Sequence, residues 1–199
     1  LGDRVLTVRK GKLVSASDYE DIDIEEEGDL QLTSDITIGG NLSITGTLDT
    51  NGFGITFDGA KTQNLYVDDF TFFDDITVYT GTLLVETNPS EIITLSGALT
   101  NYGTIRKTEP ISAIEPYYFG LAGMYPDSTG MEIEVTDRSG ADPLTAIQVD
   151  RIDANHPSAP GSATTDIYWT ITPSGWTRSW MLSTSSAVSG SKNNRSLVS

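Results

Sequence analysis

Hydrophobic and polar residues alternate regularly over residues 29–49. Because side chains of a β-strand point alternately to opposite faces, this period of two predicts one face in a core and the other in water. Gly-containing turns at 39–40 and 45–46 divide the segment into pieces of strand length. A helix could not place these apolar side chains on one stripe. The inward positions are Leu30, Leu32, Ile36, Ile38, Leu42, Ile44 and Leu48.

The same pattern continues in quasi-repeats up to residue 105. The piece GTLDTNG at 46–52 is echoed by GALTNYG at 97–103 and more loosely by GTLLVETN at 81–88. Short strands separated by Gly, Asn and Asp turns favour a β-solenoid, in which each rung buries its inward side chains against the next rung. A β-sandwich or jelly roll throughout is the alternative. The expected strands are 55–57, 65–67, 70–73, 76–78, 83–85 and 92–95.

These rungs resemble those of right-handed parallel β-helix proteins of the pectin-lyase-like superfamily. The resemblance covers residues 29–107, rests on GGNLSITGTLDTNGF, TGTLLVE and LSGALTNYGTI, and is similar in particular to noncatalytic stretches of large bacterial surface proteins. The superfamily's lyases use Asp ligands for Ca²⁺ and an Arg or Lys base. No such constellation is recognisable here, where Lys61, Arg106 and Lys107 are the only basic residues of the segment.

After Lys107 the pattern changes, and Pro110 and Pro116 indicate a boundary. Longer strands are expected at 117–121, 131–136, 145–152, 166–172 and 176–182, as in a small antiparallel β-sandwich. The strings VDRIDANHPSAP and DIYWTITPSGW resemble the closing β-domain of bacterial surface-repeat proteins. The predicted fold class is therefore all-β, a short β-solenoid or β-helix-like stack plus a small antiparallel β-sandwich. The expected units are a hairpin or strand at 1–17, the solenoid at 18–109, the sandwich at 110–185 and a tail at 186–199.

The N-terminal unit is a candidate assembly arm. Four of the 12 basic residues lie in its first twelve positions, where apolar residues flank a basic, Gly-containing segment typical of a hairpin turn. One interpretation is an edge hairpin whose charges discourage aggregation. The other is β-augmentation onto an acidic neighbour, and the basic tail would then support head-to-tail contacts between copies. The candidate assembly residues are Val5, Leu6, Val8, Arg9, Lys10 and Lys12.

Charge and composition restrict the partners. The formal net charge is −16, from 28 acidic and 12 basic residues, so nucleic acid is excluded as a partner because its binding needs an excess of Lys and Arg. No apolar run approaches the roughly 20 residues of a membrane span, and no membrane insertion is expected. Cysteine is absent, which removes disulfides and thiolate metal sites. The acidic, Thr-, Ser- and Gly-rich composition indicates an extracellular, cell-surface protein.

Clustered carboxylates are candidate Ca²⁺ ligands, because Ca²⁺ is bound by several hard oxygens at once. Residues 18–29 hold eight acidic side chains, although their spacing does not match an EF-hand loop. Two acidic doublets bracket the aromatic run at 70–73. Solvated strand edges and turns are the alternative for both clusters. The candidate ligands are Asp21, Asp23, Glu25, Asp68, Asp69, Asp74 and Asp75.

No catalytic constellation is recognisable, and we expect no enzyme. The single His, His156, lies in an Asn-His-Pro loop, and a Ser-His-Asp triad rarely forms among sequence neighbours. Trp176 and Trp180 share a strand face with Arg178 between them, a pair that suits either surface glycans or burial in the sandwich. We therefore expect an extracellular structural protein, a self-assembling subunit of a surface filament or layer. The alternative is a carbohydrate-binding or adhesive module of a larger surface protein.

Overall fold

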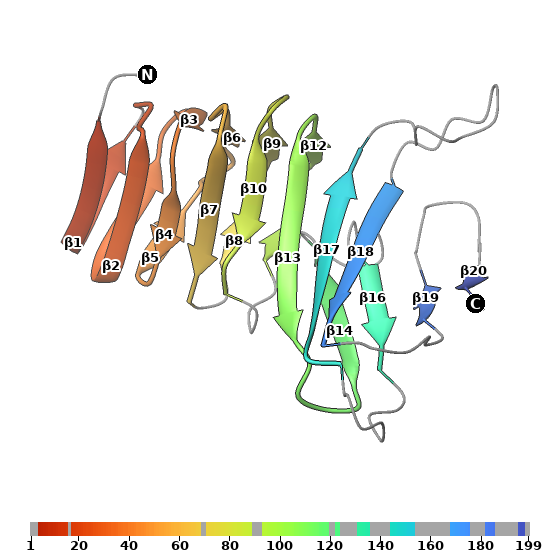
Figure 1. Cartoon of the computed structure of the whole chain (residues 1–199). Helices are drawn as coiled ribbons and strands as arrows, with labels where there is room; N and C mark the ends of the chain where they lie inside the picture. The colour runs from red at the N-terminus through yellow and green to blue at the C-terminus, as the bar shows by residue number, and fades with distance from the viewer. Residues whose placement is uncertain are drawn as a thin grey trace.

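The structure, a computed structural model, describes residues 4–15, 17–68, 71–88, 93–119, 122–123, 131–135, 144–153, 168–175, 182–185 and 195–197. Within these residues all regular elements are β-strands and there is no helix. The N-terminal strands form a β-solenoid stack of about 4 turns, and antiparallel strands follow it (Figure 1). The all-β fold with a solenoid stack, expected from the alternating pattern, is confirmed.

Short strands and tight turns make up the solenoid. Its strands are β1 (Val5–Ser15), β2 (Asp21–Leu32), β3 (Ile36–Ile38), β4 (Leu42–Ile44), β5 (Thr47–Asp49), β6 (Ile55–Phe57), β7 (Thr62–Val67), β8 (Phe72–Phe73), β9 (Ile76–Val78), β10 (Leu83–Glu86), β11 (Thr94–Leu95), β12 (Leu99–Asn101), β13 (Thr104–Pro110) and β15 (Ala122–Gly123). The remaining strands are β14 (Pro116–Phe119), β16 (Met131–Glu134), β17 (Ala146–Ile152), β18 (Tyr168–Ser174), β19 (Leu182–Ser185) and β20 (Arg195–Leu197).

Three sheets run along the stack. The first has the strand order β1-β2-β4-β7-β10-β13-β17-β18, with β5 added through its pairing with β2. The second has the order β12-β9-β6-β3, and the third β15-β11-β8. All pairs from β1 to β13 are parallel, as a solenoid requires when equivalent strands of successive rungs lie side by side.

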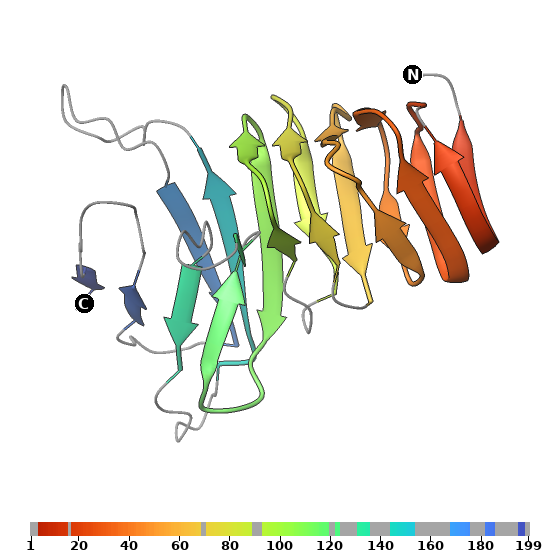
Figure 2. The same ribbon diagram turned by 180° about the vertical axis from the view of Figure 1, so that it is seen from behind.

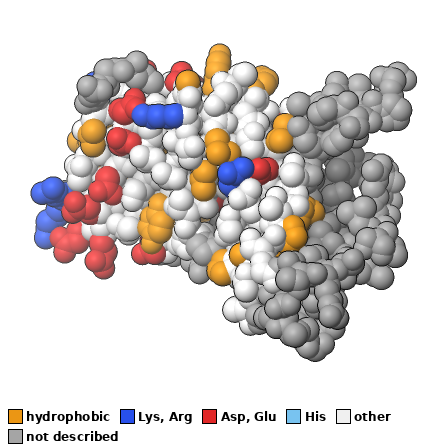
Figure 3. All heavy atoms as spheres, in the orientation of Figure 1, with side chains coloured by type: hydrophobic (Ala, Val, Ile, Leu, Met, Phe, Trp, Pro, Cys, Tyr) orange, Lys and Arg blue, Asp and Glu red, His pale blue; other side chains and the backbone are white. Residues whose placement is uncertain are grey.

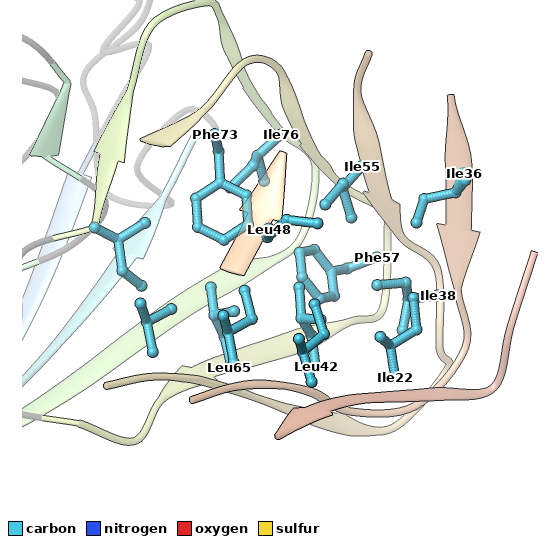
Figure 4. Close-up of a cluster of buried hydrophobic side chains, with 14 of the residues drawn as sticks. Ile22, Ile36, Ile38, Leu42, Leu48, Ile55, Phe57, Leu65, Phe73 and Ile76 are labelled. Atoms are coloured by element: carbon cyan, nitrogen blue, oxygen red, sulfur yellow. The ribbon is translucent and has the colours of Figure 1, made fainter. Parts of the chain in front are cut away.

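The solenoid core consists of columns of equivalent side chains. Ile36, Ile55 and Ile76 are Cα partners in successive rungs of the second sheet, and Leu42 is the partner of Leu65 in the first. Figure 4 shows them pointing into one interior together with Phe57, Phe73 and their neighbours. Each such buried side chain contributes about 1.5 to 3 kcal/mol. The even-numbered apolar residues of 29–49 are all buried, as the alternation predicts.

Of the two forms expected for the N-terminal unit, the structure has the strand and not the hairpin. β1 is one continuous strand of 11 residues that lies parallel to β2, with Lys10, Gly11 and Lys12 inside the paired segment. The Gly-containing segment that predicted a turn forms an irregularity within the strand instead. The register with β2 shifts after Val8, and Gly11 has a φ of 75°. Gly28 of β2 lies opposite Gly11, and a Cβ atom at Gly28 would collide with the carbonyl oxygen of Val8.

Beyond Pro110 the pairing changes from parallel to antiparallel. β17 pairs with β13 and β18 with β17, so the first sheet continues across the expected boundary (Figure 2). A separate antiparallel sheet has the order β14-β16-β19-β20. A second core lies in this region, and residues 195–197 of the expected tail form β20. Its members are Ile111, Tyr117, Phe119, Ile133, Val135, Leu144, Ile147 and Val149, with Ile171 packed against them.

Candidate functional site

The outer edge of β1 is the first candidate site. β1 ends the strand order of the first sheet, and no strand among the described residues pairs with its outer edge (Figures 1 and 2). Among the described residues no further rung covers the inward side chains of β1, although Val8 is buried. Leu13 is 38% exposed although its partner Leu30 in β2 is fully buried. This end of the solenoid offers an open sheet edge and uncovered apolar side chains.

Hydrogen bonds show which backbone groups point out of this edge. The N–H of Ile22 donates to the carbonyl oxygen of Asn41, the residue before β4, 2.9 Å away, so the neighbouring residues Asp21 and Asp23 face β1. In a parallel pair, a residue that faces the other strand bonds to the two residues that flank its partner. Thr7, the partner of Asp23, therefore directs its own N–H and C=O away from β2 and toward the free edge.

The basic side chains of β1 already have partners in the chain. The Nε atom of Arg9 lies 3.2 Å from Oε1 of Glu25, and the Nζ atom of Lys10 lies 2.8 Å from Oε2 of Glu27. Figure 3 shows the basic and acidic side chains side by side at this end. Such exposed ion pairs contribute little, about 0 to 1 kcal/mol each. A partner strand would therefore bind this edge mainly through backbone groups and apolar side chains, and less through the charged side chains.

The six predicted assembly residues fall into two groups. Val8 is buried in the solenoid core, and Leu6 packs against it while partly exposed. Val5 is 62% exposed, and Arg9, Lys10 and Lys12 are exposed as well. The sequence did not single out Leu13 and Val14, which are also exposed on this strand. These two residues were not predicted to take part in assembly, because the basic segment before them was interpreted as a turn.

The predicted Ca²⁺ ligands are dispersed over the stack. Among the described residues no group of three or more acidic or His side chains is placed to hold a metal ion. Asp21 Oδ1 accepts from the N–H of Asn41 at 2.6 Å, and Asp75 Oδ1 accepts from the N–H of Ala98 at 2.6 Å. Asp68 accepts from the hydroxyl of Tyr66. Asp69 lies outside the described residues, and Ca²⁺ binding stays a prediction.

Asp74 links three successive rungs of the solenoid through hydrogen bonds. Its Oδ2 accepts from Thr50 Oγ1 at 2.7 Å and from the N–H of Gly52 at 2.6 Å, while its Oδ1 accepts from Ser96 Oγ at 2.7 Å. The hydrogen bonds from Thr50 and Ser96 are the main reason why the pKa of Asp74 lies below its ordinary value of 3.8. Asp74 also lines a groove of about 440 Å³ with the exposed ring of Phe72.

Changing Asp74 to Asn is expected to lower the free energy of unfolding by about 1 to 3 kcal/mol at pH 7, because an amide cannot accept all three bonds. The native state holds the carboxylate below its ordinary pKa, so this stabilisation is present above pH 3.8 and is lost as the pH falls through the native value. Urea unfolding at pH 7 and near pH 3 measures both. Asp35→Asn is the matched control with a smaller loss, because its amide oxygen can still accept the single hydrogen bond that Asp35 receives from the N–H of Gly54. An equal Asp74→Asn loss at both pH values would contradict this account.

A charged cluster inside the solenoid is the second candidate site. Lys107 of β13 is 2% exposed, and its Nζ lies 2.8 Å from Oε1 of Glu109 and 4.0 Å from Oε2 of Glu86. Glu86 and Lys107 are directly paired residues of β10 and β13. Burial is the main cause that raises the pKa of Glu86 to about 7 and that of Glu109 above its ordinary value. This cluster was not predicted from the sequence, although Glu86 continues the inward phase of Leu84, and Lys107 and Glu109 continue that of Ile105.

Trp176, Arg178 and Trp180, the predicted sugar-binding residues, lie outside the described residues, as does His156. Within the described part of the chain no helix is long and apolar enough to cross a membrane. Fold and edge together define a parallel β-solenoid with an open end. Comparison of the chain with protein-family models, curated proteins and solved structures finds no significant match.

Proposed function

We propose that this chain is a structural building block that joins to further copies of itself by strand addition at β1. The observation that carries the proposal is the open edge of β1, an 11-residue strand with exposed apolar side chains and outward backbone groups. An exposed, long sheet edge is a template for pairing with another chain unless it is blocked. A structural role needs no catalytic group, in accord with the expectation that the chain is not an enzyme.

The acceptor in the second copy is the opposite end of the same sheet. β18 is the last strand in the order of the first sheet, and no strand among the described residues pairs with its outer edge, so it lies at the opposite end of the sheet from β1 (Figure 1). β18 carries no charged residue, so it meets the basic β1 without like-charge repulsion, and pairing would run along Tyr168–Thr172 because Pro173 has no N–H to donate. Pairing of two β1 strands would instead bring Arg9, Lys10 and Lys12 of both copies together. A head-to-tail contact of this kind grows an open filament when its rotation does not close.

The free edge can be blocked without breaking a bond to β2. Thr7→Pro removes an N–H that points away from β2, and proline cannot donate to an added strand. We expect the wild-type chain to form oligomers whose size grows with concentration, and the Thr7→Pro chain to stay monomeric with its far-UV circular dichroism unchanged. Sedimentation velocity over a wide concentration range measures this difference.

Thr7→Val is the matched control, because it keeps the N–H and favours a strand, and it should assemble like the wild type. A wild-type chain that stays monomeric at all concentrations would overturn the proposal. So would a Thr7→Pro chain that assembles as well as the wild type.

An extracellular, cell-surface location belongs to the same proposal, and the acidic, Cys-free composition supports it. Kinship with noncatalytic β-helical stretches of bacterial surface proteins is supported by the parallel solenoid, whose rungs follow the pieces that carry the resemblance. Bound Ca²⁺ and surface glycans are further parts of the initial expectation for which the described residues supply no assembled site.

A further inference from the structure

We propose that Lys107 and Glu86 form an amide bond that covalently joins β13 to β10 inside the solenoid, with Glu109 as the group that accepts the lysine proton. The bond would be a self-made modification, because all three reacting side chains belong to this chain and no co-reactant is needed. It goes beyond the proposed assembly at β1, which uses other residues at the opposite end of the solenoid.

The positions of the three side chains suit this reaction. Glu86 and Lys107 are Cα partners in adjacent parallel strands, so their side chains point into the interior from neighbouring places. The Nζ atom of Lys107 is 4.0 Å from Oε2 of Glu86, an oxygen bonded to the Cδ atom that the amine would attack. On its other side the same Nζ is 2.8 Å from Oε1 of Glu109, within hydrogen-bond distance. The nucleophile therefore lies between an electrophile and a base.

Burial favours the uncharged product. The side chains of Glu86, Lys107 and Glu109 are 2%, 3% and 9% exposed. Ions in such surroundings carry a large desolvation cost, whereas an amide carries no charge. Oε1 of Glu86 has no hydrogen-bond partner among the described residues, so the present ion cluster leaves a buried polar atom unsatisfied. Loss of one oxygen of Glu86 as water would remove such an atom.

The protonation states also fit. Burial raises the pKa of Glu86 to about 7, so near neutral pH a large fraction of Glu86 is the carboxylic acid, whose hydroxyl can leave as water. Burial is likewise the main cause of the raised pKa of Glu109, which makes its carboxylate a better proton acceptor. The two carboxyl groups thus differ in role through their places around Lys107.

The reaction balances without an oxidant or an activating group. The Lys107 ammonium gives a proton to the Glu109 carboxylate, and the free amine attacks Cδ of the Glu86 carboxylic acid. Glu109 then gives its proton to a hydroxyl group of the tetrahedral intermediate, which leaves as water. Glu109 takes up the one proton that the nitrogen loses, and the amide nitrogen keeps the other. One N–C bond forms, one C–O bond breaks, one water is released, and Glu109 ends protonated. The net charge of the three side chains is zero before and after.

Intact-mass spectrometry of the full chain, folded and then denatured, tests the proposal. We expect a mass lower than that of the sequence by one water molecule. Digestion with trypsin should then give a branched species in which residues 62–106 are joined to residues 107–138, because the cleavage site after Lys107 is lost when its amine is acylated. Fragmentation of that species should place the link between Glu86 and Lys107.

Two controls keep the test specific. Lys61 and Glu20 also lie 2.8 Å apart but are 63% and 24% exposed, and they should remain unlinked in the same digest. Glu109→Gln keeps the side-chain size but cannot accept the proton, and its chain should show the full sequence mass. A wild-type chain that retains the full mass after prolonged incubation near neutral pH overturns the proposal. A lost water located at any other pair of residues overturns it as well.

Discussion

Replacing Lys107 with Met is expected to lower the free energy of unfolding by about 3 to 5 kcal/mol at pH 7, because removing one partner of a buried ion cluster leaves the others uncompensated. Glu86 and Glu109 would then share the interior without their cation. The expectation holds whether the three groups are ions or an amide, since both states require Lys107. Chemical denaturation followed by circular dichroism measures the loss.

The pH dependence of this variant has a definite sign. Burial raises the pKa values of Glu86 and Glu109 in the native state, so the folded chain binds protons more tightly than the unfolded chain. The Lys107→Met chain should therefore be most stable near pH 5 and lose stability as the pH rises through 7. Adding Glu86→Gln should recover part of the stability at pH 8. Lys61→Met, which removes an exposed ion pair, is the control and should cost less than about 1 kcal/mol. A Lys107→Met loss that is equal at pH 5 and pH 8 would contradict the account.

Replacing Gln63 with Met is expected to cost roughly 2 to 6 kcal/mol, because about 1 to 3 kcal/mol is lost for each of the two buried groups left unsatisfied, the carbonyl oxygen of Gly40 and the N–H of Gly59. Gln63 is fully buried in β7. Its Nε2 donates to the carbonyl oxygens of Ile38 at 2.9 Å and Gly40 at 2.6 Å, and its Oε1 accepts from the N–H of Gly59 at 2.9 Å. Met fills the same space but makes none of these bonds.

Thermal and urea unfolding compare the Gln63→Met chain with Asn64→Ala. Asn64 is the next residue but faces the surface, where its N–H and Nδ2 donate to Asn41 Oδ1 at 2.9 and 3.0 Å. The Asn64→Ala change removes only the Nδ2 bond, because the backbone N–H remains, and it should cost about 1 kcal/mol since water replaces Nδ2 at the surface. Equal stability of the Gln63→Met and wild-type chains would contradict this prediction, because it would show that the backbone around Gly40 and Gly59 does not need the hydrogen bonds of Gln63.

The alternating pattern predicted the solenoid well, because the inward positions of each short strand follow from the alternation of apolar and polar residues within that strand. Ile36 and Ile38 are visible as inward residues in the sequence alone, and both are buried. The same rule failed for inward polar residues such as Gln63 and Lys107, since a polar residue was assigned to the surface. Gln63 donates to the carbonyl oxygens of Ile38 and Gly40, which are 25 and 23 residues away in another rung, a distance that no local pattern reveals.

Charge patterns were the least reliable guide. Arg9, Lys10 and Gly11 suggested a turn, yet the pairing of Arg9 with Glu25 and of Lys10 with Glu27 aligns β1 along β2. The carboxylates of Asp21, Asp74 and Asp75 accept hydrogen bonds from turns of neighbouring rungs, a role that the charge pattern did not predict, and Ca²⁺ binding by them stays a prediction. An acidic side chain at a solenoid turn can bind a cation or accept hydrogen bonds from a neighbouring rung. Which groups surround it depends on how the rungs stack, and the local sequence does not contain that information.

Electron microscopy of the concentrated full chain tests the central claim most directly, because assembly at β1 extends the first sheet from copy to copy. The account predicts filaments in which β1 of one copy lies about 4.8 Å from a strand of the next, the spacing of neighbouring strands in a sheet. Single particles of one chain at every concentration, with β1 still at an open end, would contradict it.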